Sequence, residues 1–126
     1  MSVTKSSAAT NAACDAVVDL IDVGSLSPYG LMVIQTVDST TITSHRLSNP
    51  SFSDAVDGTS QANMIYDGTA LVDGTASTFG FYDRDGTFVW GGDITGPGGG
   101  GDLELTSISI PVDSTVSITS ARYIVP

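Results

Sequence analysis

Cations are scarce in this chain, and cysteine and histidine occur once each. Only Lys5, Arg46, Arg84 and Arg122 oppose fourteen acidic residues, which gives a formal net charge of −10. Nucleic-acid binding needs clustered Lys and Arg at the phosphates, and an anionic membrane would repel this chain. We therefore expect no nucleic acid and no membrane as partner. The acidity has two open interpretations, namely solubility through self-repulsion and complementarity to a basic protein surface or to several cations.

The single cysteine, Cys14, excludes an intrachain disulfide. It lies among alanines, which indicates a small buried thiol and not a reactive one. One Cys and one His are too few to form a zinc site. The N-terminus has no apolar signal-peptide segment, and no run approaches the ~18 apolar residues of a membrane helix. We expect the chain to be made and kept in the cytosol, or carried by an assembly formed there.

A length of 126 residues and a hydrophobic fraction of 40% suit one domain with one core. Thr, Ser, Val and Ile are abundant beside fourteen Gly and five Pro. This mixture favours short strands joined by tight turns. We divide the chain into an N-terminal arm and helix at residues 1–24 and a β-domain at residues 25–126.

Residues 6–22 show a helical pattern that can start at Ser6 or Ser7 and end before Gly24. Spacings of three and four produce one apolar stripe, made of Ala9, Ala13, Ala16, Val17, Leu20 and Ile21. A separate polar face contains Asp15, Asp19 and Asp22. We expect the stripe of small residues to pack closely, either onto a sheet or onto a symmetry mate.

The remaining pattern predicts strands separated by turn signals at intervals of about 8–12 residues. The expected strands are 31–37, 41–47, 59–66, 76–82, 87–91, 102–110 and 115–125. The first begins with a continuous apolar run, which indicates burial on both faces. A phase break at Thr106-Ser107 suggests a bulge. The predicted fold is an all-β antiparallel sandwich, jelly-roll or immunoglobulin-like, of six to eight strands with one N-terminal α-helix.

A β-hairpin at residues 74–90 is the expected centre of the core. It contains five of the nine aromatic residues, namely Phe79, Phe81, Tyr82, Phe88 and Trp90. Its turn, Asp83-Arg84-Asp85-Gly86, has the Asp and Gly residues that turn geometry favours. Phe79, Phe81 and Trp90 could alternatively form a sugar-binding platform. We favour the core because few other large side chains are available to fill it.

No catalytic, cofactor or metal residue is assigned, and we expect no enzyme and no cofactor. His45 shares an alternating face with Thr41 and Thr43, which predicts exposure to solvent, and no Gly-x-Ser-x-Gly motif occurs. A calcium loop starting at Asp83 would need glutamate at its twelfth position, where Ile94 stands. The glycine-rich loop at 94–101 is followed by an acid and a strand, whereas a phosphate loop needs a lysine and a helix.

The chain contains an ordered set of segments at residues 8–19, 47–55, 58–63, 73–76, 83–87, 102–107 and 116–120. In its order and spacing, this set resembles a family of small tailed-bacteriophage virion proteins. The resemblance implies a β-sandwich structural protein without catalytic residues. It most directly implies a capsid decoration (cement) protein on the capsid exterior, made in the host cytoplasm. The implied partners are the major capsid protein and other copies of the chain, with a trimer favoured.

Two other functions stay open beside decoration. One is a tail, neck or fibre component of the same virion. The other is a carbohydrate-binding adhesion module. For the decoration function, we expect residues 1–22 to form the attachment or trimer contact, because this segment is separate from the β pattern and has a stripe of small residues.

Overall fold

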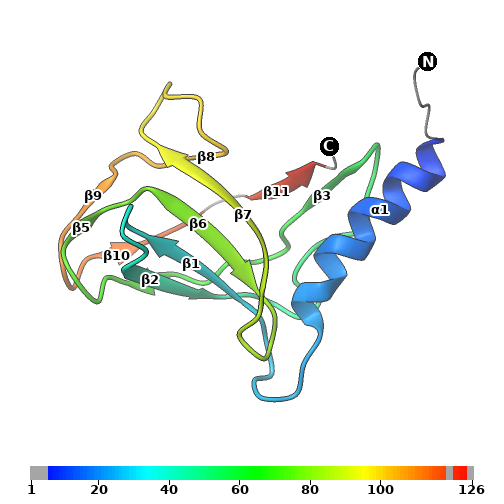
Figure 1. Ribbon diagram of the computed structural model, residues 1–126, viewed down its shortest axis with the longest axis horizontal. Coiled ribbons are helices and arrows are strands. Elements are labelled where there is room, and N and C mark those ends of the chain that lie inside the picture. The colour runs from blue at the N-terminus through cyan, green and yellow to red at the C-terminus, as the bar shows by residue number, and fades with distance from the viewer. Residues whose placement is uncertain (1–5, 119–120, 125–126) are drawn as a thin grey trace.

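The computed structural model describes residues 6–118 and 121–124, and these residues are mostly β with one N-terminal α-helix (Figure 1). The predicted strand 115–125 and the N-terminal arm therefore lie partly outside the described residues. Helix α1 spans Ser7–Asp19 and continues as the 3₁₀ turn η1, Leu20–Asp22. No helix in the described part is long and apolar enough to cross a membrane.

The start of α1 is confirmed at Ser6, whose hydroxyl accepts a hydrogen bond from the Ala9 N–H at 3.1 Å. This N-cap satisfies one of the N–H groups that the first turn leaves without a helical partner. Gly24 follows the helical segment with φ +133°, a conformation that favours glycine. Arg84 and Asp85 of the hairpin turn lie directly against it, so a side chain at position 24 would also clash.

The main sheet has five strands in the order β2-β1-β6-β7-β8. Their bounds are β1 Leu31–Gln35, β2 Thr41–Arg46, β6 Thr78–Tyr82, β7 Phe88–Thr95 and β8 Leu103–Glu104. The first four strands pair antiparallel, but β8 runs parallel to β7. The prediction of a wholly antiparallel fold is therefore wrong here. Gly98 and Gly100 adopt φ near +80°, which lets the short loop return the chain to the β7 edge in the same direction.

Three two-residue or three-residue ladders complete the β structure. Strand β3 (Thr59–Gln61) pairs with β11 (Arg122–Ile124), β4 (Gly68–Thr69) with β10 (Thr115–Val116), and β5 (Gly74–Thr75) with β9 (Ser109–Ile110). The described residues thus form eleven strands, more than the six to eight predicted. The excess has two sources. The predicted runs 102–110 and 115–125 each change partner midway and form two strands, and the short strands β4 and β5 lie outside every predicted run. The break at Thr106-Ser107 is where the chain leaves β7 and later joins β5.

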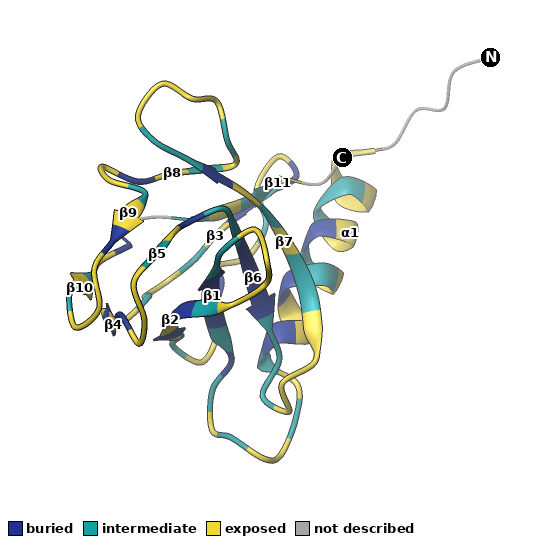
Figure 2. Cartoon of the chain, turned by 60° about the vertical axis from the view of Figure 1, so that its left-hand side comes forward, coloured by how far each residue is buried: buried dark blue, intermediate teal, exposed yellow. Residues whose placement is uncertain are grey.

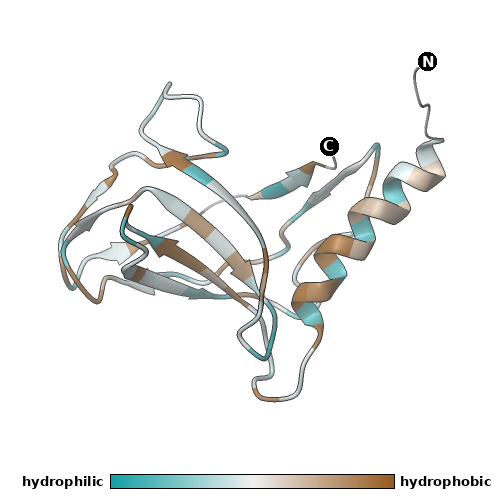
Figure 3. Ribbon diagram, in the orientation of Figure 1, coloured by the Kyte–Doolittle hydropathy of each residue, from teal (hydrophilic) through white to brown (hydrophobic). Residues whose placement is uncertain are grey.

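The core lies between the inner face of the main sheet, the ladders and α1. Buried segments of β1 and β6 face the buried side of α1 in Figure 2, and apolar residues concentrate in the same places in Figure 3. Met32, Ile34 and Phe81 of the sheet are fully buried, as is Ile21 of η1. Each such side chain stabilises the fold by about 1.5–3 kcal/mol relative to exposure. Burial at the centre of β1 extends to both faces, as predicted.

Helix α1 packs through a different face from the one predicted. Cys14, Val18 and Ile21 are buried, whereas most of the predicted stripe, including Ala9, Ala13, Ala16 and Leu20, is exposed. The reason is that polar side chains beside Cys14 and Val18 bond to the loop at residues 51–58, so the polar face turns inward. The apolar periodicity of the sequence therefore predicted the wrong buried face of α1. An alanine side chain gains little free energy from burial, so a stripe of alanines does not decide which face of the helix packs inward.

Candidate functional site

The β6–β7 hairpin holds two aromatic pairs on opposite faces of the sheet. Phe81 pairs with Trp90 and Tyr82 pairs with Phe88, and the register shifts between these two pairs. Val89 is the extra residue on β7, so the hairpin contains a β-bulge. The bulge places Trp90 on the inner face and Phe88 on the outer face, although residues two positions apart in a regular strand share a face.

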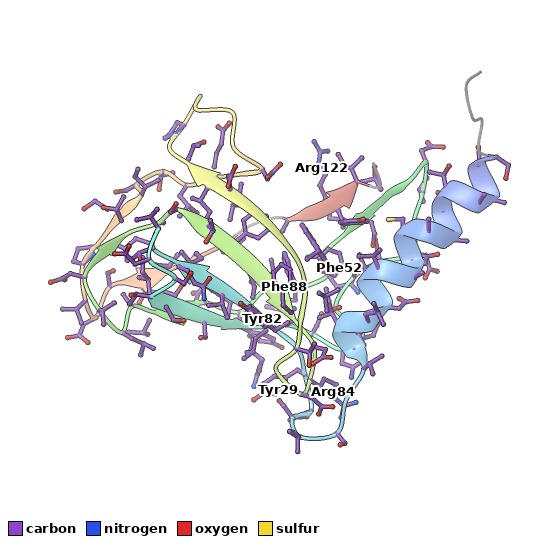
Figure 4. All side chains as sticks on the ribbon, in the orientation of Figure 1. Tyr29, Phe52, Tyr82, Arg84, Phe88 and Arg122 are labelled. Atoms are coloured by element: carbon purple, nitrogen blue, oxygen red, sulfur yellow. The ribbon has the colours of Figure 1, made fainter. Side chains whose placement is uncertain are left out.

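The inner pair belongs to the core, as the sequence predicted. The Phe81 and Trp90 rings stack at 4.6 Å between centroids with an interplanar angle of 21°. Phe79 meets Trp90 edge to face, and Phe52 meets Phe81 in the same way. Figure 4 shows Phe52 between the sheet and α1, which agrees with its expected inward direction. Phe79 and Phe81 are 6% and 0% exposed, so they cannot act as a surface sugar platform.

The outer pair belongs to a cross-strand row that we call the outer row: Arg46, Leu31, Tyr82 and Phe88. The register pairs Arg46 with Leu31, Leu31 with Tyr82, and Tyr82 with Phe88. Arg46 is exposed, Phe88 is 56% exposed, and the two residues between them are half-buried. The rings of Tyr82 and Phe88 meet edge to face at 5.6 Å. Sequence reasoning missed this row because the bulge that creates it has no separate sequence signal.

Arg46 is held at one end of the outer row by two tyrosines. Its guanidinium carbon lies 4.8 Å from the centre of the Tyr29 ring and 4.1 Å from the centre of the Tyr66 ring. These are cation–π distances, and the two rings restrict the otherwise flexible side chain. Tyr66 is itself fixed by the hydrogen bond from its N–H to the Arg46 carbonyl at 2.9 Å. A shallow depression beside this cluster is lined by Pro28, Ser48 and Asn49 as well.

His45 is buried, and the prediction of a solvent-exposed histidine is wrong. It shares a face with Thr43 as expected, but this is the inner face of β2, opposite Met32. Residues 65–71 run beside β2, and a side chain at Gly68 would lie about 3.0 Å from the His45 ring. Alternation correctly grouped the residues of one face, but it could not reveal that a later segment covers it.

Both ring nitrogens of His45 already have partners. Nδ1 lies 3.0 Å from the Tyr66 carbonyl oxygen, and Nε2 lies 2.8 Å from the Thr43 hydroxyl. A carbonyl only accepts, so we assign the ring proton to Nδ1 and the role of acceptor to Nε2. Burial lowers the pKa of His45, which keeps the ring neutral. A histidine in this state supports the core and has no nitrogen available to a substrate.

Cys14 is a buried free thiol, as predicted. Its Sγ lies 3.7 Å from the Tyr123 carbonyl oxygen. Burial, together with the nearby Asp15 carboxylate, raises the pKa of the thiol. The protonated form is the less nucleophilic one, which agrees with a structural role.

The hairpin turn uses its aspartates to bind backbone N–H groups. Asp83 accepts hydrogen bonds from the Asp85 and Thr87 N–H groups, both at 2.9 Å. The carboxylate of Asp85 accepts two more from Ser25 and Leu26, and these bonds lower its pKa. The turn prediction is confirmed, and the turn also fixes the loop that follows α1. No group of three or more possible metal ligands occurs in the described residues.

The glycine loop closes around an acidic side chain of the same chain. The Glu104 carboxylate accepts hydrogen bonds from Gly98 N–H at 3.0 Å and Gly100 N–H at 3.4 Å. The Asp102 carboxylate accepts another from Asp93 N–H at 3.1 Å. Two N–H groups of this loop are therefore already bonded to a carboxylate of the same chain.

A cleft of about 750 Å³ lies between β8 and the C-terminal ladders. Phe79 and Trp90 reach it from the core, and Arg122 lies at its edge. The Trp90 Nε1 atom is buried and has no hydrogen-bond partner. Because that atom is closed to solvent and the acidic lining residues already bind backbone N–H groups, we assign no ligand to this cleft.

Helix α1 is attached to the β-domain by three polar side chains. The Asn11 side-chain oxygen accepts from Gly58 N–H and the Asp15 carboxylate from Ala55 N–H, both at 2.8 Å, and the Asp22 carboxylate accepts from Ser51 N–H at 3.0 Å. Partial burial and the nearby carboxylates, including Asp15 and Asp22, raise the pKa of Asp19. The opposite face is left in solvent with Ala9, Ala13, Ala16 and Leu20.

Comparison with protein-family models, with curated proteins and with solved structures found no match to this chain. The candidate functional surfaces therefore stand on geometry alone: the outer row on the main sheet and the exposed face of α1.

Proposed function

We propose that this protein is a non-enzymatic structural protein of a tailed-phage virion, most directly a capsid decoration protein that binds the assembled major capsid protein. The resemblance of the sequence to small virion proteins provides the specific class. We further propose that the curled sheet and the three ladders act as the two layers of a distorted sandwich. Such a body suits a protein that must keep its shape on the capsid exterior.

The observation that carries this proposal is the exposed apolar face of α1. The exposed alanines of α1 continue into Leu20 of η1, which is 51% exposed, and Val23 directly after η1 is 55% exposed. The N-terminal turns of α1 also reach beyond the strands in Figure 1. Because polar side chains attach the opposite face, a partner can cover this one without disturbing the fold. Alanines let another backbone approach closely, which suits contact with a capsid protein or with a symmetry-related copy.

A decoration protein stabilises a capsid by binding the assembled form and not the free subunit. Its contact surface must therefore be complete before binding and available on the outside of its own fold. The outward face of α1 meets both conditions. A tail, neck or fibre component would use the same surface on a different partner, and the number of copies per virion distinguishes the two. Copies that match the capsid subunits in number favour decoration.

The test is co-sedimentation of the purified protein with assembled capsids of the phage that encodes it. Ala13→Glu adds a charge to the exposed helix face and keeps a good helix former. We expect it to weaken binding roughly tenfold or more, because a charge would be desolvated in the contact. The matched control is Leu71→Glu, which adds the same charge at a residue that is 65% exposed in the loop between β4 and β5.

Wild-type binding by Ala13→Glu, with its far-UV circular dichroism unchanged, would contradict a contact through α1. Absence of capsid binding by the wild-type chain would contradict the decoration function itself.

A further inference from the structure

The outer face of the main sheet is a second exposed surface, separate from α1. Its most prominent feature is the outer row, which crosses four strands from Arg46 to Phe88. Neighbouring strands are spaced by about 4.8 Å, so the backbone at Arg46 lies roughly 10 Å from that at Tyr82. The row is therefore longer than a single small ring.

The rings of Tyr82 and Phe88, at one end of the outer row, lie over Gly80 of β6. Gly80 and Gly91 pair two positions along β6 from Tyr82, beyond the inward-facing Phe81–Trp90 pair. A Cβ atom at Gly80 would lie 3.0 Å from Cε1 of Tyr82 and 3.2 Å from Cε1 of Phe88. The two rings therefore rest against the backbone at Gly80, and the ring of Phe88 is 56% exposed whereas Tyr82 is half-buried.

Hydrogen-bonding side chains lie further along the same outer face, where Thr78 is four residues, roughly 13 Å, from Tyr82 on β6. Gln35 pairs with Thr78, Thr78 pairs with Asp93, and Ser44 lies two residues from Arg46 on the same face of β2. Ser44 and Asp93 are exposed, and the other two are half-buried. Aromatic rings, together with an amide, two hydroxyls and a carboxylate further along the same face, are chemically suited to an oligosaccharide. The C–H face of one sugar packs on the rings, while hydroxyl groups of neighbouring sugars exchange hydrogen bonds with the polar side chains.

The charge of the row narrows the ligand class. Arg46 is fixed between two tyrosine rings, and the N–H groups at the edge of its guanidinium plane can donate to a carboxylate. The chain as a whole has a net charge of −10, which disfavours nucleic acids and polyanionic polysaccharides. A ligand with one carboxylate and no other charge therefore complements the outer row. The carboxylate can pair with the guanidinium of Arg46, while the uncharged part of the ligand packs on the rings of Tyr82 and Phe88.

We propose that the outer row binds a short oligosaccharide whose terminal sugar carries a carboxylate. One sugar of the ligand packs on Tyr82 and Phe88, and the carboxylate pairs with Arg46. Binding is a function of the free protein in solution and does not depend on attachment to a capsid. A failure of this site therefore leaves the proposed decoration function untouched.

The experiment uses the purified full-length chain with isotope labelling for NMR. Sialyllactose is the acidic probe and lactose is its neutral counterpart, and an array of acidic oligosaccharides extends the search. We expect sialyllactose or another acidic oligosaccharide of the array to shift amide signals of β1, β2, β6 and β7. Phe88→Ala should weaken binding roughly tenfold or more, because the stacking surface is lost.

Arg46→Gln tests the role of the charge. It should weaken binding of the acidic oligosaccharide by about tenfold or more, since a charge-assisted hydrogen bond is lost, and should leave binding of the neutral counterpart unchanged. Arg122→Gln is the matched control, because Arg122 is an exposed arginine on β11, away from the outer row (Figure 4).

Three results would overturn the proposal. The first is the absence of binding by every acidic oligosaccharide tested. The second is wild-type affinity in a folded Phe88→Ala protein. The third is tighter binding of an acidic peptide than of any acidic oligosaccharide, which would assign the row to a protein partner.

Discussion

The two aromatic pairs of the β6–β7 hairpin differ in environment more than in chemistry. Phe81 and Trp90 stack inside the core, whereas Tyr82 and Phe88 lie on the outer face, only one or two positions away in sequence. One extra residue, Val89, separates the two environments. The comparison teaches that aromatic content alone does not indicate a role. Burial makes the inner pair a source of stability, and exposure makes the outer pair available for recognition.

Removing the inner ring should have the largest effect. Phe81→Ala deletes a fully buried side chain from a cluster of aromatic rings. We expect a loss of about 3–5 kcal/mol in the free energy of unfolding, because transfer and cavity costs add. Urea denaturation followed by circular dichroism measures it. A loss below about 1 kcal/mol would show that the inner pair is not central to the core.

Inward-facing and outward-facing side chains of the helical segment should also differ in how much they contribute to the free energy of unfolding. Asp22→Ala leaves the Ser51 N–H without its acceptor, and Asp19→Ala removes an exposed aspartate from the same helical segment. We expect a loss of about 1–3 kcal/mol for Asp22→Ala. For Asp19→Ala we expect a change within about 0.5 kcal/mol. Equal effects of the two substitutions in the same denaturation assay would contradict the assignment of the polar side as the attached one.

The buried histidine predicts a pH dependence of stability. Burial lowers the pKa of His45 in the folded state, while the unfolded state retains a value near 6.5. The unfolded state therefore binds the proton more readily, so His45 should contribute a loss of stability as pH falls below about 6.5. The measurement compares the melting temperature at pH 7.5 and pH 5.5 for the wild type and for His45→Gln. An equally large fall with pH in both proteins would assign the effect to other groups.

Removing the outer ring should have the smallest effect on stability. Phe88 is 56% exposed, so Phe88→Ala should change the free energy of unfolding by no more than about 1 kcal/mol. The same substitution should weaken oligosaccharide binding roughly tenfold or more, which separates recognition from folding. A stability loss comparable to that of Phe81→Ala would show that the two pairs are not distinct in role.

Local sequence signals predicted the elements with clear local chemistry. Ser6 or Ser7 was predicted as the helix cap, of which the structure has Ser6, and Asp83-Arg84-Asp85-Gly86 was predicted as a hairpin turn. Both predictions succeeded because side chains a few residues away satisfy these backbone groups. The concentration of aromatics around the turn correctly located the core. Composition correctly indicated a mostly β chain, and the periodicity of residues 6–22 correctly indicated the one N-terminal helix.

By itself, the sequence determined the β-rich class, the N-terminal helix, the central hairpin and the buried state of Cys14. Only the tertiary structure decided which side of each element faces inward. His45 is buried because residues 65–71 cover β2. The alanines of α1 face outward because Asn11, Asp15 and Asp22 accept hydrogen bonds from the loop at residues 51–58. The tertiary structure also created the outer row through the bulge at Val89. Periodicity groups residues by face, but the burial of a face depends on contacts between segments far apart in the chain.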